Sequence, residues 1–290
     1  MDVIDLLRVQ PLLLITAAGL LGLLVGSFLN VVAYRLPVML ERQWRAECAE
    51  LLTGQDTDAT LERFDLVHPR SHCPHCGHGI RAWENVPLLS FLFLRGRCSS
   101  CGERIPWRYP LVELGCGLLS ALVAWRLGFG WPLLAALAFT WASLALTLID
   151  LDHQLLPDAI TLPLLWLGLL CSLGHWFTDP TSAILGAVAG YLVLWSLYQL
   201  FRLLTRKEGM GYGDFKLLAA AGAWLGWQQL PLVILLSSFV GALVGITLIV
   251  ARGRDRNLPI PFGPYLATAA WIALLWGPDL TRAYLRFAGL

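Results

Sequence analysis

The sequence has few charged residues and only one long polar segment. Of its 290 residues, 14% are Asp, Glu, Lys or Arg, while 57% are hydrophobic. Soluble domains average about 25% charged and about 45–50% apolar residues. This shortage of charge excludes an ordinary soluble protein and indicates a membrane protein. The net charge of +1 points to no particular partner, and we expect no nucleic acid among them.

The apolar residues are grouped in stretches that are about as long as a bilayer is thick. A membrane-spanning helix needs roughly 17–25 residues. Eight stretches reach or approach this length, the sixth and eighth only marginally: 12–34, 110–127, 131–149, 159–177, 183–204, 215–230, 231–251 and 260–277. We therefore predict an all-α polytopic membrane protein with about eight transmembrane helices, six or seven being the alternatives.

Lysine and arginine are unevenly placed along the chain, and cytoplasmic loops carry an excess of both. With eight spans and an outside N-terminus, most of the 21 lysines and arginines fall on the inside. Both termini are then predicted outside. The large polar insertion at 35–108 lies in the cytoplasm, and its first part, "ERQWRAECAELL", has helical spacing. It separates a first membrane helix (1–34) from the remaining ones (109–290).

Small residues are paired at helical spacing in several apolar stretches. Glycines four residues apart let two membrane helices approach closely. We interpret these pairs as ordinary packing positions of a helix bundle: Gly22/Gly26, Gly186/Gly190, Gly222/Gly226 and Gly241/Gly245.

Four cysteines in the large loop have the spacing of a zinc ribbon, C-x2-C-x21-C-x2-C. They are Cys73, Cys76, Cys98 and Cys101. Four thiolates complete the tetrahedral shell of one zinc ion, and a reducing cytoplasm disfavours disulfides. A loop this short also needs a stabilising cross-link or metal ion in addition to its small apolar core. We predict one structural Zn²⁺ in a zinc-ribbon-like loop.

Two other interpretations of the cysteine pairs remain open. They could be redox-active dithiols, although no thioredoxin-like strand–helix pattern surrounds them. Alternatively, a histidine could replace a cysteine and leave an open catalytic zinc site. The chain has no HExxH motif for a metallopeptidase. Because the cysteines already fill the shell, we interpret the nearby histidines as surface residues: His68, His72, His75 and His78.

Acidic residues occur at the inner ends of two predicted spans. Asp214 lies in "GMGYGDF", where the sixth apolar stretch begins. Asp150, Asp152 and Asp158 lie in "LIDLDHQLLPD", after the third stretch. Both segments are on the predicted inside, so these carboxylates can meet.

A carboxylate at a membrane edge is costly and indicates function by default. Two adjacent carboxylates share one proton, which is the chemistry of an aspartic peptidase. Asp150 and Asp214 are the best placed for such a pair, whereas Asp152 is interpreted as a solvated charge and Asp158 as a helix cap. Asp150 and Asp214 could themselves be caps.

Every second residue before Asp214 is a glycine, and glycine permits backbone angles that other residues resist. We predict that Gly211 and Gly213, with Gly209, let a substrate backbone pass close to Asp214. A transporter with the aspartates as a proton or cation relay is the alternative function. Transport sites usually lie near the midplane instead.

Together these segments resemble the bacterial type IV prepilin peptidases. "GYGDFKLLAAAGAWLGW" and "LIDLDHQLLPD" resemble the two aspartate motifs of that family. "GSFLNVVAYRLP", the paired CxxC knuckles, "WRYPLVEL" and "PFGPYLA" resemble further parts of it. The resemblance extends from about Gly26 to Ala267.

The resemblance implies a GxGD-type aspartic peptidase of the bacterial inner membrane, with periplasmic termini and Asp150 and Asp214 as the catalytic pair. Such enzymes cleave leaders from type IV prepilins and type II secretion pseudopilins at the cytoplasmic face. Many also methylate the new N-terminus with S-adenosylmethionine. No strand–GxGxxG–helix unit marks a site for that donor, and the sequence indicates no oligomeric state.

Overall fold

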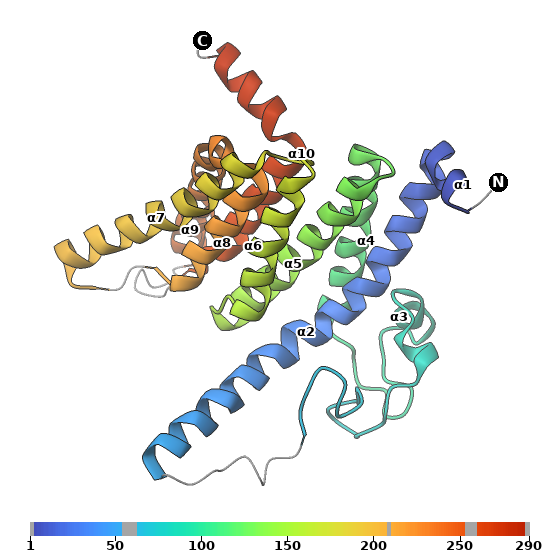
Figure 1. The fold of residues 1–290 in the computed structure, drawn as a ribbon. Coiled ribbons are helices and arrows are strands. Elements are labelled where there is room, and N and C mark those ends of the chain that lie inside the picture. Colours follow the sequence, from blue (N-terminus) through green and yellow to red (C-terminus); the bar gives the residue numbers. More distant parts are fainter. Residues whose placement is uncertain (1–2, 54–62, 208–209, 253–259, 288–290) are drawn as a thin grey trace. The chain divides into compact units, whose positions relative to one another are not determined.

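The computed structural model describes residues 3–53, 63–207, 210–252 and 260–287, and these residues are folded mainly as helices (Figure 1). Within these ranges there is no β-strand, only two isolated β-bridges. The chain divides into two compact units, Met1–Trp125 and Arg126–Leu290. The predicted all-α class is confirmed.

The first unit combines two long helices with an irregular segment that carries two short helices. The long helices are α2 (Pro11–Thr53) and α4 (Arg108–Leu127), and α1 (Val3–Val9) precedes them. The short ones are η2 (Ala82–Asn85) and α3 (Leu89–Phe93).

Helix α2 is longer than the sequence indicated. We expected the first membrane helix to end near residue 34, but α2 continues to Thr53 with Pro37 inside it. Proline removes one backbone hydrogen bond, yet the residues that follow are mostly strong helix formers. Arg45 also pairs with Glu41 one turn earlier, at 2.5 Å. The membrane helix and the helical start of the predicted loop are therefore one element.

Glycines bring α2 and α4 together, as expected for a packing position. A Cβ on Gly26 would lie 2.8 Å from the Cα of Glu113, and one on Gly22 would overlap the side chain of Ser120. Larger residues at either position would force the helices apart.

The second unit is a bundle built around a short central helix. It contains α5 (Trp131–His153), α6 (Asp158–Leu173), α7 (Pro180–Thr205), α8 (Tyr212–Leu225), η3 (Trp227–Gln229), α9 (Leu230–Arg252) and α10 (Gly263–Phe287). Figure 1 shows α8 in the middle of this bundle, and it packs against α6, α7 and α10.

Helix α8 is apolar on every side because it is enclosed by other helices. From Asp214 to Leu225 all its residues are buried except Lys216, which is half-buried. Its 14 residues extend about 21 Å at 1.5 Å per residue, less than the roughly 30 Å hydrocarbon core of a bilayer. The short length leaves the first turn, which contains Asp214, inside the bundle.

Several helices are suited to crossing a membrane. Among the described residues, five segments are long and apolar enough: Pro11–Leu52, Arg108–Leu127, Trp131–His153, Pro180–Thr205 and Trp227–Thr247. The protein is thus a multi-pass helical membrane protein. The other three predicted spans correspond to α6, α8 and α10, of which α6 and α8 are shorter.

Candidate active site and metal centre

Asp150 lies in the last turn of α5, with its carboxylate turned into the bundle. The residue is 5% exposed. Helix α5 ends three residues later, where Gln154 adopts a left-handed conformation and its N–H bonds the carbonyl of Asp150. Oδ2 of Asp150 accepts a buried hydrogen bond of 3.0 Å from the backbone N–H of Gly263, the first residue of α10. Two helix ends therefore hold this carboxylate.

Asp214 lies in the first turn of α8 and is 7% exposed. Its N–H bonds the carbonyl of Gly211, the N-cap residue. Oδ1 of Asp214 is buried without a hydrogen-bond partner among the described residues. The Asp150 carboxylate is near enough to act on Asp214 electrostatically. The structure thus brings together the two aspartates that the sequence singled out.

An apolar wall formed by Leu156 flanks the pair. A Cβ on Gly213 would lie 2.6 Å from the Cβ of Leu156, and a Cβ on Gly263 would lie 3.1 Å from its Cδ2. A Cβ on Gly263 would also come within 2.6 Å of Oδ2 of Asp150. The lack of a side chain at both glycines therefore allows the close packing of the site.

The role expected for the glycines before Asp214 needs correction. Neither Gly211 nor Gly213 has a positive φ, and Gly211 is in ordinary extended conformation at φ −79°. The space beside Gly213 is filled by Leu156, whereas a Cβ on Gly211 would make only an ordinary contact, 3.8 Å from Oδ2 of Asp214. Gly213 is thus required for its small size and not for an unusual backbone angle, while a larger residue at Gly211 would fit. Gly209 lies outside the described residues.

The other two acidic residues of this region have different surroundings. Asp158 is the first residue of α6 and follows the N-cap Pro157. Its two oxygens accept hydrogen bonds from Nζ of Lys216 at 2.6 and 2.7 Å. Asp158 is thus an ion-pair partner and not the N-cap that we expected. Asp152 is exposed.

Sequence reasoning missed Gly263, Leu156 and Lys216. The segment "PFGPYLA" was noted only as part of the family resemblance. A glycine immediately before a proline at the start of an apolar stretch was the available signal. It could not indicate which side chain that glycine would contact.

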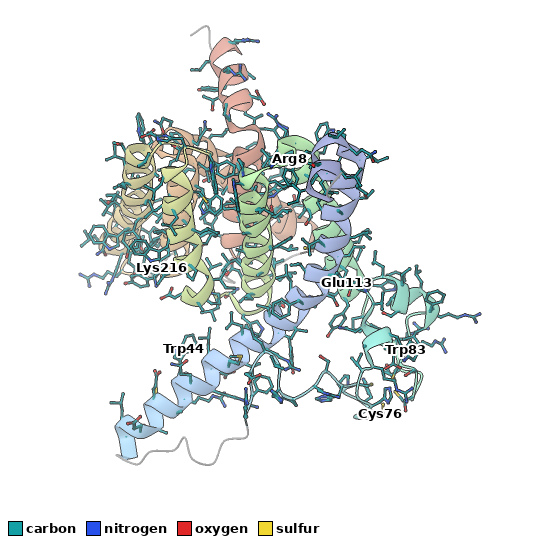
Figure 2. All side chains as sticks on the ribbon, turned by 45° about the vertical axis from the view of Figure 1, so that its right-hand side comes forward. Arg8, Trp44, Cys76, Trp83, Glu113 and Lys216 are labelled. Carbon is teal, nitrogen blue, oxygen red and sulfur yellow. The ribbon has the colours of Figure 1, made fainter. Side chains whose placement is uncertain are left out.

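The four cysteines of the first unit form one cluster. Their sulfur atoms all lie within 4.8 Å of one another. Sγ of Cys73 is 3.8 Å from that of Cys101, and Sγ of Cys76 is 4.0 Å from that of Cys98. Zn–S bonds of about 2.3 Å in a tetrahedron place the sulfurs about 3.8 Å apart. The cluster therefore fits one zinc ion, and Figure 2 shows Cys76 in the segment below Trp83.

Both cysteine pairs have the same backbone turn. The N–H of Cys73 bonds the carbonyl of His78, and the N–H of Cys98 bonds that of Glu103. The glycine after each second cysteine has a positive φ, 71° at Gly77 and 73° at Gly102. Glycine adopts this conformation without a steric penalty. Each CxxC-Gly segment thus forms a knuckle that presents two thiols to one point.

The backbone also favours a thiolate in this cluster. The N–H groups of Cys101 and Ser100 lower the pKa of the Cys98 thiol to about 6. The thiolate is the form that binds metal. The backbone thus favours the protonation state of Cys98 that a metal cation needs.

The histidines do not join the metal cluster. Nε2 of His78 lies 3.3 Å from Oε2 of Glu84 and 3.3 Å from Oγ of Ser99. Ser99 also donates a hydrogen bond to Oε1 of Glu84. Glu84 thereby links the two knuckles, since His78 follows the first and Ser99 lies within the second. The only possible metal cluster in the described ranges is the four cysteines.

Buried polar side chains attach the loop to the long helices of its own unit. Arg35 of α2 donates to the carbonyls of Asp65 and Pro69, at 3.0 and 2.6 Å. Glu113 of α4, labelled in Figure 2, accepts the N–H of Leu88 at 2.8 Å. Bonds to backbone groups fix the path of a loop that has little apolar core.

The fold and the site define a class: a multi-pass helical membrane protein with a buried aspartate pair and a four-cysteine cluster. Residues 20–127 match the bacterial peptidase A24 N-terminal domain, and residues 136–246 match the type IV leader peptidase family. The chain belongs to the type IV leader peptidase family, as its resemblance indicated.

Three relatives carry the name prepilin leader peptidase/N-methyltransferase. The protein of Pseudomonas aeruginosa is 57% identical over 289 residues, which covers 100% of this chain and 99% of the relative. That of Pseudomonas putida is 59% identical over 284 residues, 98% of each chain. That of Aeromonas hydrophila is 58% identical over 282 residues, 97% of each chain. No solved structure matches this chain.

Proposed function

We propose that this chain is a membrane aspartic endopeptidase that removes the leader from type IV prepilins and from pseudopilins of type II secretion. The observation that supports it is the buried pair Asp150 and Asp214, one on the end of α5 and one at the start of α8. Both lie inside the segment that matches the leader peptidase family. The full-length relatives are named as prepilin leader peptidases.

The proposed reaction needs one charged and one protonated carboxyl group. The charged carboxylate takes a proton from water as the water oxygen attacks the scissile carbonyl carbon, and the protonated carboxyl gives its proton to the carbonyl oxygen. When the intermediate collapses, the first group passes its proton to the leaving nitrogen. The second recovers a proton from the intermediate's hydroxyl, and the C–N bond breaks.

Burial strengthens this chemistry. Leu156 excludes water from the side of the pair where it packs against Gly213 and Gly263. Electrostatic interactions are stronger in a low-dielectric site than in bulk water. A developing charge on the carbonyl oxygen therefore interacts strongly with the pair.

In the proposed topology eight helices cross the membrane, with the shorter α6 and α8 and the longer α10 added to the five apolar spans. The excess of lysine and arginine on one side supports periplasmic termini and a cytoplasmic active site. The location is the bacterial inner membrane, where the lipid bilayer surrounds the bundle. The substrate keeps its own hydrophobic helix in the bilayer.

A second reaction follows cleavage in this proposal, supported by the names of the relatives. S-adenosylmethionine, when bound, supplies the methyl group for the amine that cleavage exposes. The described residues do not single out its binding site. Nothing among the relatives favours the transport alternative.

Zinc has a structural role in this proposal. Cys73, Cys76, Cys98 and Cys101 would hold the ion, because their sulfurs have the spacing of a tetrahedral shell. The ion would keep the two knuckles together. With four cysteine ligands, no position remains open for water.

Mass spectrometry of a prepilin incubated with the purified protein and S-adenosylmethionine tests both activities. Wild type, Asp150→Asn and Asp214→Asn are run in parallel. We expect leader loss only with wild type, and a methyl increment on the new N-terminus. Cleavage by both variants would show that the aspartates are structural.

A further inference from the structure

The two carboxylates of the proposed pair have different hydrogen-bond partners. Oδ2 of Asp150 accepts the N–H of Gly263 at 3.0 Å in a buried position. Oδ1 of Asp214 is buried and, in the part of the chain described, accepts no hydrogen bond. A backbone donor favours the charged form of a carboxylate, whereas burial without a donor favours the neutral form.

Helix ends do not cancel this difference. Asp214 lies at the positive end of α8, which favours an anion. Asp150 lies at the negative end of α5, but the amide that it binds is the first of α10. Each carboxylate thus has the positive end of one helix beside it. The backbone N–H of Gly211 also acts on the Asp214 carboxylate. The difference between the two groups is that Oδ1 of Asp214 is buried without a partner among the described residues, whereas neither oxygen of Asp150 is.

Neighbouring charges act in the same direction. Lys216, two residues from Asp214, is bound by both oxygens of Asp158 and not by the pair. The charge that acts on Asp214 is the Asp150 carboxylate. Two like charges in a buried site repel one another, so only one carboxylate is ionised.

We infer that Asp214 holds the proton of the pair at rest, and that Gly263 is a positioning residue that keeps Asp150 ionised and oriented as the base. This inference rests on the proposed peptidase function. In the reaction, Asp150 then accepts the proton of the attacking water. Asp214 gives its own proton to the carbonyl oxygen. As the C–N bond breaks, Asp150 passes its proton to the leaving nitrogen and Asp214 recovers one from the hydroxyl of the intermediate.

Infrared spectroscopy of the resting full-length protein tests the assignment. Aspartate labelled with ¹³C in its carboxyl group identifies a protonated Asp band and separates it from Glu113, which is also buried. At neutral pH the labelled band is expected in wild type and Asp150→Asn, and absent from Asp214→Asn. Loss of the band in Asp150→Asn with retention in Asp214→Asn, or no labelled band in wild type, would overturn the assignment.

The substitution Gly263→Ala tests the positioning role. Its Cβ would lie 2.6 Å from Oδ2 of Asp150 and displace the carboxylate from the amide. Misplacement of a catalytic group by about 1 Å costs about 10²-fold in rate, so kcat should fall about 10²-fold with KM nearly unchanged. Gly277→Ala, in the same helix, is the control, since its Cβ meets the flexible end of Gln229. An unchanged kcat in Gly263→Ala would overturn the role.

The two tests separate this inference from the proposed function. The infrared measurement needs no substrate and reports only which aspartate carries the proton. Failure of the wild type to cleave a prepilin would reject the peptidase function itself. Normal cleavage combined with an infrared band on Asp150 would reject the inference alone.

Discussion

Leu156 and Gly213 are in direct contact: a Cβ on Gly213 would lie 2.6 Å from the Cβ of Leu156. Gly213 immediately precedes Asp214, and Leu156 also packs beside Gly263, the donor to Asp150. The packing of one leucine against two glycines therefore couples both carboxylates. Gly213 therefore packs against the protein's own core.

This contact predicts a pair of compensating substitutions. In Gly213→Ala the new methyl group should displace the first turn of α8 from Leu156. Because Asp214 moves with that turn, kcat should fall about 10²-fold. Adding Leu156→Gly removes the Cβ that the new methyl group meets at 2.6 Å and should restore much of the activity. Cleavage of a prepilin, measured as a double-mutant cycle, checks the coupling.

Gly211→Ala is the matched control for that cycle. Its Cβ would be 3.8 Å from the Asp214 carboxylate, an ordinary contact, so packing predicts nearly normal kcat. A raised KM in Gly211→Ala would support the substrate cradle at this position. Equal activity losses in Gly213→Ala with and without Leu156→Gly would contradict the packing account.

The four-cysteine cluster predicts a metal-dependent loop. Cys73→Ser or Cys98→Ser should release zinc and disorder residues 71–105, because three sulfurs and a hydroxyl bind zinc less well than four thiolates. Zinc content by mass spectrometry of the metal checks this. Cys48→Ser is the control, since Cys48 is exposed on α2 and should leave the zinc content unchanged.

Chelation distinguishes a structural ion from a catalytic one. Slow loss of activity that follows loop unfolding is expected for a structural zinc. Immediate inhibition with an intact loop would favour the metallopeptidase alternative instead. Unchanged zinc content in both cysteine variants would reject the four-cysteine site.

Glu84 makes the loop sensitive to acid. The N–H of Arg81 and the hydroxyl of Ser99 hold the pKa of Glu84 below its ordinary value of 4.5. A carboxylate with a lowered folded-state pKa contributes stability above its ordinary pKa and loses it as the pH falls through the folded value. Protection of residues 71–105 from hydrogen exchange, corrected for intrinsic rates, should therefore fall below pH 4.5.

Two variants isolate this contribution from acid release of zinc. Glu84→Gln should reduce protection at neutral pH and flatten the acid transition. Glu103→Gln, in an exposed side chain of the same loop, should keep the wild-type transition. An identical transition in both variants would show that Glu84 does not link the knuckles.

Features that depend on nearby residues were predictable from the sequence. The helical spans follow from apolar runs, and the metal cluster follows from the spacing of two CxxC pairs, because each knuckle is a local turn. The aspartates could be paired because the charge of the loops placed both on one side. These inferences needed no knowledge of which helices touch.

Contacts between distant residues were not predictable in the same way. Gly263 and Asp150 are 113 positions apart, and nothing local to either segment indicates the bond. The continuity of α2 through Pro37 was missed because proline usually ends a helix. The sixth stretch was only marginally long enough to span, but the enclosure of α8 by other helices was missed because a fully enclosed helix has the same apolar composition as a lipid-facing one.

The approach of α7 to α8 supplies the last prediction, because α8 carries Asp214. A Cβ on Gly222 would overlap the carbonyl of Gly186, and one on Gly190 would lie 2.5 Å from the carbonyl of Leu218. Backbone atoms cannot move aside as a flexible side chain can. Gly222→Ala should therefore cost about 1–3 kcal/mol of stability and reduce cleavage as well.

Thermal unfolding in detergent measures that cost against a matched helix glycine. A Cβ on Gly115 of α4 would meet no neighbouring element within 4 Å among the described residues. Gly115→Ala should therefore be neutral or stabilise by up to about 1 kcal/mol through helix propensity. Equal midpoints for the two variants would contradict close packing of α7 on α8. A lowered midpoint for Gly222→Ala alone, with proportionate loss of cleavage, would show that this helix contact supports the position of Asp214.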